Sequence, residues 1–257
     1  MINVKLIGGL GNNMFQYSLG RILAEEKNYN LSVENIANLQ KYFPNISEIT
    51  TNNTVSGEML ELGYSSTEQT VQHVNMKAAL DHKGPIHVNG FFQKYEYYTK
   101  HLNKIRKWFE YDHSNFLKPK QNDLVIHYRL TDYVTLNWHL PPEAFLQTIE
   151  KNNIKYDTCY LITDQPNHPL IAPLSKIKNI VIINQEPLAD FTLLKYAKQL
   201  IISHSTFSWW ASFLGDQEWV YIPMYNSSNS IWKTVPIEID DVNLIYDCKK
   251  YIKQVME

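Results

Sequence analysis

The sequence predicts an α/β protein built on parallel sheets, and three observations support that fold class. Short apolar runs rich in β-branched residues alternate with segments whose apolar residues recur at helical spacing. Such alternation favours parallel sheets with helices on their faces. The chain of 257 residues, 44% of them hydrophobic, is long enough for two domains with real cores. A polar break at 110–122 indicates the connection, so we expect domains at 1–115 and 116–257.

The first half begins with a β-loop-α unit. After an apolar strand, the glycine-rich segment Gly8 to Asn13 leads into a helix with Phe15, Leu19 and Leu23 on one face. The expected elements are strands at 2–8, 30–34 and 86–92, a helix following the glycines, and a helix at 94–108. Residues 44–85 are polar and poorly periodic, and they predict no assignable element.

The second half repeats the alternation more regularly. Its expected strands lie at 124–128, 158–163, 180–183, 200–203 and 219–222, and its helices at 142–151, 187–199 and 206–214. This regularity predicts a parallel sheet in the second domain. Trp209 and Trp210, in the last of these helices, are expected to pack in its core.

Composition excludes several function classes. A formal charge of −2 argues against a general nucleic-acid binder, which needs a broad cationic face. Cys159 and Cys248 match no zinc or disulfide spacing, which suits a reducing compartment. The N-terminus lacks a signal peptide and no apolar run could span a bilayer, so we expect a cytoplasmic protein. For the basic tail of Lys249, Lys250 and Lys253, a solvated helix face is favoured over peripheral membrane contact.

The run at 124–133 carries the strongest chemical signal. It predicts a buried strand that delivers His127, Arg129 and Asp132 to a sheet edge, where α/β proteins build sites. Arginine suits an anion there, because its planar fork stays charged and can bind two oxygens of a phosphate or carboxylate. Two simpler roles stay open: His127 as a core histidine, and Asp132 as a residue that only orients Arg129.

The N-terminal glycines suggest a second anion or sugar contact. Gly9 and Gly11 would let backbone N–H groups approach a ligand, and the following helix adds the positive end of its dipole. The dinucleotide fingerprint needs a third glycine where this chain has Met14, so a nicotinamide cofactor is disfavoured. A plain tight turn is the alternative.

Two more strand ends carry polar residues. Strand 200–203 is followed by hydroxyl residues, so Ser205 or Thr206 can cap the next helix while N–H groups face a phosphate. Ser203, His204 and Ser205 do not form a hydrolase triad by adjacency alone. Asp164, after strand 158–163, suits a hydrogen bond to a nucleobase or ribose, or a local Asx turn.

Three of these segments resemble the motifs of the α-1,2-fucosyltransferases of glycosyltransferase family 11. They are Gly8 to Tyr17, His127-x-Arg129-x-x-Asp132-Tyr133, and Ser205 to Ala211. Gly90 to Gln93 and Asp190 to Leu194 are similar as well. The resemblance implies a GT-B-type fold of two facing Rossmann-like domains. It also implies a metal-independent, inverting transfer of L-fucose from GDP-fucose to a galactose-containing glycan.

The resemblance also implies roles for residues. Arg129 would bind the donor pyrophosphate, His127 and Asp164 would lie near the nucleotide, and the donor would occupy the C-terminal domain with the acceptor on the N-terminal side. Ser205, Thr206, Phe207 and Ser208 would contact phosphate, while Gly9, Gly11 and Asn12 would reach the cleft from the other domain. The sequence itself does not identify the base that deprotonates the acceptor hydroxyl, for which Asp132, His127 and Glu186 are candidates. The sequence has no Asp-x-Asp, HExxH or P-loop motif, so no metal is expected.

The chain departs from the family pattern near Arg129. Leu130 stands where a second arginine is usual, Thr131 replaces a glycine, and Asp164-Gln165 replaces paired aspartates. A charge-assisted hydrogen bond contributes roughly 1.5 to 3 kcal/mol, so the missing arginine predicts a donor contact weakened by about tenfold or more. Three alternatives therefore stay open: a noncatalytic nucleotide-sugar or glycan binding protein, a transferase for another deoxysugar and, on the glycines alone, a dinucleotide-dependent oxidoreductase.

Overall fold

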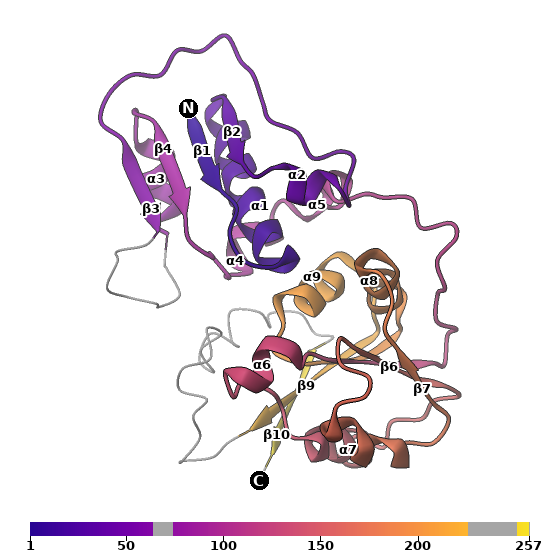
Figure 1. The fold of residues 1–257 in the computed structure, drawn as a ribbon. Coiled ribbons are helices and arrows are strands. Elements are labelled where there is room, and N and C mark those ends of the chain that lie inside the picture. The colour runs from indigo at the N-terminus through magenta and orange to yellow at the C-terminus, as the bar shows by residue number, and fades with distance from the viewer. Residues whose placement is uncertain (64–73, 226–250, 257) are drawn as a thin grey trace. The chain divides into compact units, whose positions relative to one another are not determined.

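The computed structural model describes residues 1–63, 74–225 and 251–256, and its chain divides into two compact units (Figure 1). The first unit holds Met1–Tyr111 and the second begins at Asp112. Each unit is a parallel β-sheet with helices packed on it.

The first unit is built on a four-stranded sheet in the order β2-β1-β4-β3, with every neighbouring pair parallel. Its elements are β1 (Ile2–Lys5), α1 (Leu10–Lys27), β2 (Leu31–Glu34), α2 (Ala37–Gln40), β3 (Leu60–Gly63), α3 (Met76–Asp81), β4 (Ile86–Asn89), α4 (Glu96–Thr99) and α5 (Leu102–Trp108). The long helix α1 contacts β1, β2 and β4, so it covers one face of this sheet.

Close packing of α1 on β1 explains one glycine of the helix. A Cβ atom at Gly20 would lie 2.1 Å from Cγ2 of Val4, which is well inside van der Waals contact. Val4 is 2% exposed, and the α1 residues Leu19 and Leu23 are fully buried. The absence of a side chain at Gly20 therefore lets the helix approach the strand closely and bury the helical face that the sequence predicted.

The structure corrects the predicted first half in four places. Strand 2–8 ends at Lys5 and strand 86–92 ends at Asn89, although apolar residues follow each of them in the sequence. The single helix expected at 94–108 is two helices, α4 and α5, because the backbone leaves helical geometry at His101, with ψ near 7°. Residues 44–85 contain β3 and α3, and β3 is an incompletely buried edge strand without the clear alternation that predicts strands.

The second unit is built on a six-stranded sheet in the order β10-β9-β8-β5-β6-β7, again parallel throughout. Its strands are β5 (Leu124–Tyr128), β6 (Cys159–Thr163), β7 (Ile180–Ile183), β8 (Gln199–Ile202), β9 (Trp219–Tyr225) and β10 (Tyr251–Met256). Its helices are α6 (Thr131–Thr135), α7 (Pro142–Lys151), the 3₁₀ helix η1 (Pro169–Lys176), α8 (Pro187–Tyr196) and α9 (Thr206–Leu214).

Strand β5 lies inside this sheet, and all five of its residues are buried. Helices α8 and α9 pack together over one face, while α7 lies on the other (Figure 1). Trp209 and Trp210 are 3% and 0% exposed, which confirms their predicted place in the core. Burial on both faces explains why β5 begins with the continuous apolar run 124–126 rather than with an alternating pattern.

The second half also differs from prediction at some boundaries. The expected helix 187–199 ends at Tyr196, and the short helices α6 and η1 were not predicted. The helix-face interpretation of the basic tail is wrong for Lys253, which lies in β10 and pairs in parallel with Ile222 of β9. Lys249, Lys250 and Cys248 lie outside the described residues. Cys159 is a buried free cysteine.

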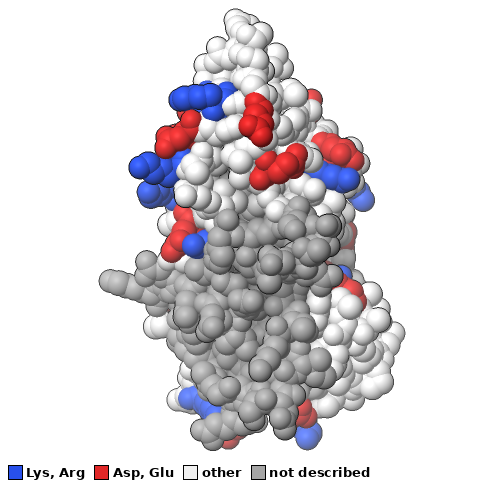
Figure 2. All heavy atoms as spheres, turned by 90° about the vertical axis from the view of Figure 1, so that its left-hand side faces the viewer, with Lys and Arg blue, Asp and Glu red and all other residues white. Residues whose placement is uncertain are grey.

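The surface carries mixed charge on the face drawn in Figure 2. There, the acidic and basic side chains of the described residues are interspersed. This distribution agrees with the formal net charge of −2. Within 1–63, 74–225 and 251–256, no helix combines the length and apolar character needed to cross a membrane.

Candidate functional site

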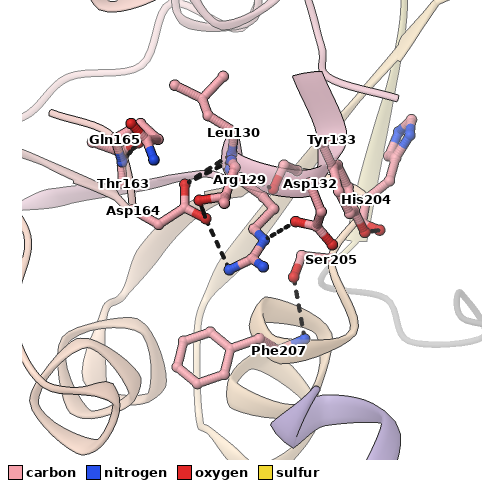
Figure 3. A network of polar contacts seen from close by, with 12 residues as sticks. Arg129, Leu130, Asp132, Tyr133, Thr163, Asp164, Gln165, His204, Ser205 and Phe207 are labelled. Carbon is pink, nitrogen blue, oxygen red and sulfur yellow. Dashed lines mark hydrogen bonds and ion pairs between the residues drawn. The ribbon is translucent and has the colours of Figure 1, made fainter. Parts of the chain in front are cut away.

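The predicted site residues of the second unit converge at the carboxyl edge of its sheet. The chain continues from β5 to β6 and β7 on one side, and then crosses to place β8, β9 and β10 on the other. The ends of β5 and β8 therefore flank a topological switch point, where open α/β sheets bind ligands. Arg129 directly follows β5, Asp164 follows β6 and Ser205 follows β8 (Figure 3).

Two carboxylates hold the Arg129 guanidinium. Its Nε donates to Oδ1 of Asp132 at 2.7 Å, and its Nη1 lies 2.8 Å from Oδ2 of Asp164 (Figure 3). The Arg129 side chain is nevertheless 37% exposed. Among the described residues Nη2 has no protein partner, so this part of the fork is available to an anion. The predicted interaction of Asp132 with Arg129 is present.

Asp164 connects the end of β6 to the turn after β5. Its Oδ1 accepts the backbone N–H of Leu130 at 2.9 Å, and its Oδ2 accepts the Thr131 hydroxyl at 2.7 Å. Burial alone would raise the pKa of Asp164, but the hydrogen bonds from Thr131 and Leu130 and the Arg129 charge outweigh burial and lower that pKa. The carboxylate thus stays ionised and bonds to the β5–α6 turn, whereas the sequence suggested a ligand contact or a local Asx turn.

His127 is buried beneath this network and is 6% exposed. Its Nδ1 lies 3.1 Å from the Ser203 hydroxyl, and its ring centroid lies 5.8 Å from that of Phe207. Burial, helped by the Arg129 charge and opposed by Asp164, lowers the pKa of His127 to about 4. The imidazole is therefore neutral near pH 7 and is a weak proton acceptor.

This buried imidazole predicts an acid-sensitive contribution to stability. The unfolded state binds a proton at His127 near the ordinary pKa of about 6.5, whereas the folded state binds it only near 4. The contribution is fully present above the unfolded pKa and is lost as the pH falls from about 6.5 to 4. Over that window, urea unfolding should show the wild type losing about 3 kcal/mol relative to His127→Asn.

The comparison with His127→Asn isolates this one group. Asp190, whose pKa is raised to about 6, and His204, whose pKa is lowered, titrate in both proteins and cancel in the difference. Parallel stability curves for the two proteins between pH 7 and 4 would show that His127 is not a buried neutral group.

The segment after β8 caps helix α9 as the sequence predicted. Ser205 is the N-cap residue, and its hydroxyl accepts the backbone N–H of Phe207 at 3.3 Å (Figure 3). Ser208 is fully buried and donates to the Ser205 carbonyl at 3.1 Å, so its hydroxyl serves the local fold. Thr206 is the first helical residue and is incompletely buried. An anion at this end would meet the helix dipole.

His204 faces away from its serine neighbours. Its Nε2 lies 3.0 Å from the Pro223 carbonyl, which agrees with the exclusion of a hydrolase triad. The His204 carbonyl accepts the hydroxyl of Tyr133 at 2.9 Å. This bond ties α6, and with it Asp132, to the turn that begins α9.

The predicted glycine motif lies at the start of α1 in the first unit. Gly9 is the N-cap residue with no side-chain cap, and Gly8 adopts a positive φ of 79°. The side chain of Asn12 accepts from Gln93 at 3.1 Å, which joins two of the predicted motifs within this unit. The grouping of Gly9, Gly11 and Asn12 with Arg129 stays a prediction.

The side chain of Leu130 does not lie where a second arginine could bind the same anion as Arg129. Its side chain is fully buried in a cluster with Tyr128, Leu140 and Phe145. Figure 3 shows it pointing away from the Arg129 guanidinium. A side chain at position 130 therefore faces the hydrophobic core, and only Arg129 reaches the sheet edge from this pair.

Asp190 belongs to a segment that resembles the family in sequence, and the structure shows that its carboxylate lies in an unusual environment. It lies in the first turn of α8, after the carboxyl end of β7, and its buried Oδ1 has no hydrogen-bond partner among the described residues. Burial raises its pKa to about 6 against the opposing bonds from Gln185. The next residue, Phe191, packs on Phe207 with ring centroids 5.4 Å apart. The sequence feature that could have identified Asp190 as a candidate site residue is a carboxylate inside an apolar helical segment.

The described residues contain no group of three or more His, Cys, Asp or Glu side chains that could hold a metal ion. The polar centre thus consists of one arginine, two carboxylates and a helix N-terminus, at the switch point of a parallel sheet. This is the type of centre that an α/β protein uses to bind an anionic ligand.

Comparisons with known proteins agree with an α/β protein that binds an anionic ligand. The model of glycosyl transferase family 11 matches residues 173–252. An α-1,2-colitosyltransferase of Escherichia coli is 24% identical over 267 aligned positions, which cover 83% of this chain and 87% of that protein. Together they confirm the resemblance to glycosyltransferase family 11 that the sequence motifs predicted.

Solved structures support the fold. NodZ α-1,6-fucosyltransferase soaked with GDP-fucose superposes with a TM-score of 0.54 at 11% identity, covering 83% of this chain and 92% of that one. A mutant of Arabidopsis thaliana FUT1 in complex with GDP gives a TM-score of 0.51 at 13% identity, with coverages of 89% and 70%. The predicted GT-B-type α/β fold, with a parallel sheet in each unit, is confirmed.

Proposed function

We propose that the protein is an inverting, metal-independent glycosyltransferase that moves L-fucose from GDP-fucose to a hydroxyl of a galactose-containing glycan in α-1,2 linkage. The observation that carries the proposal is Arg129: two carboxylates hold its guanidinium at the switch point, and its Nη2 has no partner in the part of the chain that the structure describes. The family match and the fucosyltransferase neighbours support it. In this proposal, residues 116–257 bind the donor, residues 1–115 bind the acceptor, and the enzyme acts in the cytoplasm.

The donor diphosphate would sit between Arg129 and the start of α9. Arginine can bind two phosphate oxygens at once, and the helix N-terminus adds N–H groups and a favourable dipole. The Ser205 side chain already caps Phe207, so Thr206 is the residue of this turn best placed to contact a phosphate oxygen. These groups stabilise the negative charge that grows on the departing diphosphate, which is preorganised electrostatic catalysis.

Asp190 is a candidate to bind the guanine ring of the donor nucleotide. Guanine presents neighbouring N–H donors, and a carboxylate oxygen that has no partner among the described residues is a suitable acceptor for them. The side chain follows β7 at the same edge of the sheet as Arg129. Donor N–H groups would also favour the ionised form of this carboxylate and so lower its raised pKa.

Of the three candidate bases, Asp132 fits best. His127 is buried and its pKa is lowered to about 4, and Glu186 is an exposed residue at the N-cap of α8. Asp132 is 50% exposed and uses only Oδ1 to hold Arg129. In the proposed step the acceptor oxygen attacks the anomeric carbon opposite the departing diphosphate, and Oδ2 of Asp132 takes the hydroxyl proton.

The donor sugar has one specific alternative. The curated relative is named for transfer of a colitosyl group in α-1,2 linkage, so a different sugar on the same kind of donor is the second candidate function. Both candidates use the same diphosphate chemistry and differ only in the contacts to the sugar ring.

A donor and acceptor panel tests the proposal. The purified protein is incubated with GDP-fucose, the corresponding colitosyl donor and other nucleotide sugars, with and without EDTA, and glycan products are identified by mass spectrometry. We expect an α-1,2-linked fucosyl product that EDTA does not abolish. GDP binding without any product would favour the noncatalytic alternative, and thermal stabilisation by NAD but not GDP would favour the oxidoreductase.

A further inference from the structure

We propose that Asp164 is a positioning residue, which fixes both Arg129 and the start of helix α6, and that the Thr131 hydroxyl holds Asp164 in place. This inference rests on the proposed function and deepens it. It assigns the end of β6 a role in aligning the arginine for a diphosphate, in place of the direct nucleotide contact that the sequence suggested.

The contacts of Asp164 carry the inference. Its two oxygens accept from three consecutive residues of the neighbouring turn: Nη1 of Arg129 at 2.8 Å, the backbone N–H of Leu130 at 2.9 Å, and Thr131. Thr131 contributes its hydroxyl at 2.7 Å and its backbone N–H at 3.4 Å. The Asp164 side chain is 24% exposed, so water competes little for these bonds.

Helix α6 depends on this carboxylate for its first turn. Leu130 is the N-cap residue, but an apolar side chain cannot accept hydrogen bonds, and no side-chain cap is present. Asp164 instead supplies the acceptor from another strand and adds negative charge at the positive end of the helix. It therefore fixes the backbone that carries Asp132.

The two carboxylates then act on one guanidinium. Asp164 holds Nη1 directly, and by fixing α6 it also places Asp132, whose Oδ1 holds Nε. A long flexible arginine is thereby confined to one orientation before any ligand binds, which lowers the entropic cost of binding. Gln165 adds no charge here, and its backbone N–H donates to the Thr163 hydroxyl.

Thr131 allows a test with matched substitutions. Thr131→Val removes the hydroxyl at nearly constant shape, Thr131→Ser keeps it, and Asp164→Asn keeps the shape of the carboxylate but removes its charge. Asp157→Asn is the control, because Asp157 is an exposed carboxylate at the opposite end of β6. Calorimetry measures the affinity of each protein for GDP and GMP, since only GDP carries the second phosphate.

We expect the preference of the wild type for GDP over GMP to fall about tenfold in Asp164→Asn and several-fold in Thr131→Val. Thr131→Ser and Asp157→Asn should keep the wild-type ratio, and GMP affinity should change little. In an Arg129→Ala background, Asp164→Asn should have no further effect on the ratio, because it acts through Arg129.

An unchanged ratio in Thr131→Val and Asp164→Asn would overturn the inference, as would equal weakening of GDP and GMP. If Asp164→Asn does not fold, the Thr131→Val and Thr131→Ser pair still decides. A wild type with no preference for GDP over GMP would instead count against the proposed function, so the two failures are distinguishable.

Discussion

Replacing Arg129 by alanine is expected to lower kcat/KM for sugar transfer by about a hundredfold or more, the effect of removing one preorganised group that stabilises transition-state charge. The loss should exceed the loss in GDP affinity, because charge on the diphosphate grows as the glycosidic bond breaks. The variant should still fold, since Arg129 is 37% exposed. Initial rates over a range of donor concentrations measure both parameters.

Arg129→Lys is the matched control. It keeps the positive charge but not the planar fork that holds Asp132 and Asp164 while leaving Nη2 available. We expect it to recover only part of the lost activity. A folded Arg129→Ala variant with wild-type kcat/KM would remove Arg129 from the mechanism.

Introducing the arginine that is usual in the family, by Leu130→Arg, is expected to destabilise the protein by about 3 to 5 kcal/mol and to leave donor affinity no better. Leu130 is fully buried among Tyr128, Leu140 and Phe145. A charge placed there has no ionised partner in this cluster and loses its hydration. Chemical unfolding measures the stability, and GDP titration of the remaining folded protein measures the affinity.

Leu130→Met tests whether charge, and not substitution itself, is responsible. A volume-conserving apolar change should cost less than about 1.5 kcal/mol. If Leu130→Arg were as stable as Leu130→Met and bound GDP more tightly, position 130 would have access to the donor, and its assignment to the core would be wrong.

The fold was predictable where strands and helices are strongly apolar. The central strand β5 begins with the continuous apolar run 124–126, and α7, β7 and α9 begin and end where the sequence predicted. Boundaries were less accurate where an element stops although apolar residues continue in the sequence, as after Lys5 and Asn89. The edge strand β3 and the short helix α6 were missed, because their stability comes from a neighbouring strand and from Asp164, contacts that no local pattern contains.

The site was predictable as a set of residues but not as a network. Residues that follow the carboxyl ends of parallel strands lie at one edge of the sheet, and the structure places Arg129, Asp164 and Ser205 there. The sequence could not show that Asp164 bonds to the turn after β5, or that Leu130 faces the core. Both follow from the path of that turn, which long-range hydrogen bonds determine. Whether the first-unit residues Gly9, Gly11 and Asn12 reach the donor stays a prediction.

A crystal structure of the protein with GDP would show directly whether Arg129 binds the donor diphosphate. We expect the Arg129 guanidinium to lie within hydrogen-bond distance of the diphosphate oxygens, at the start of α9, with no metal ion bridging them. A structure in which GDP binds elsewhere, while Arg129 contacts only Asp132 and Asp164, would contradict it.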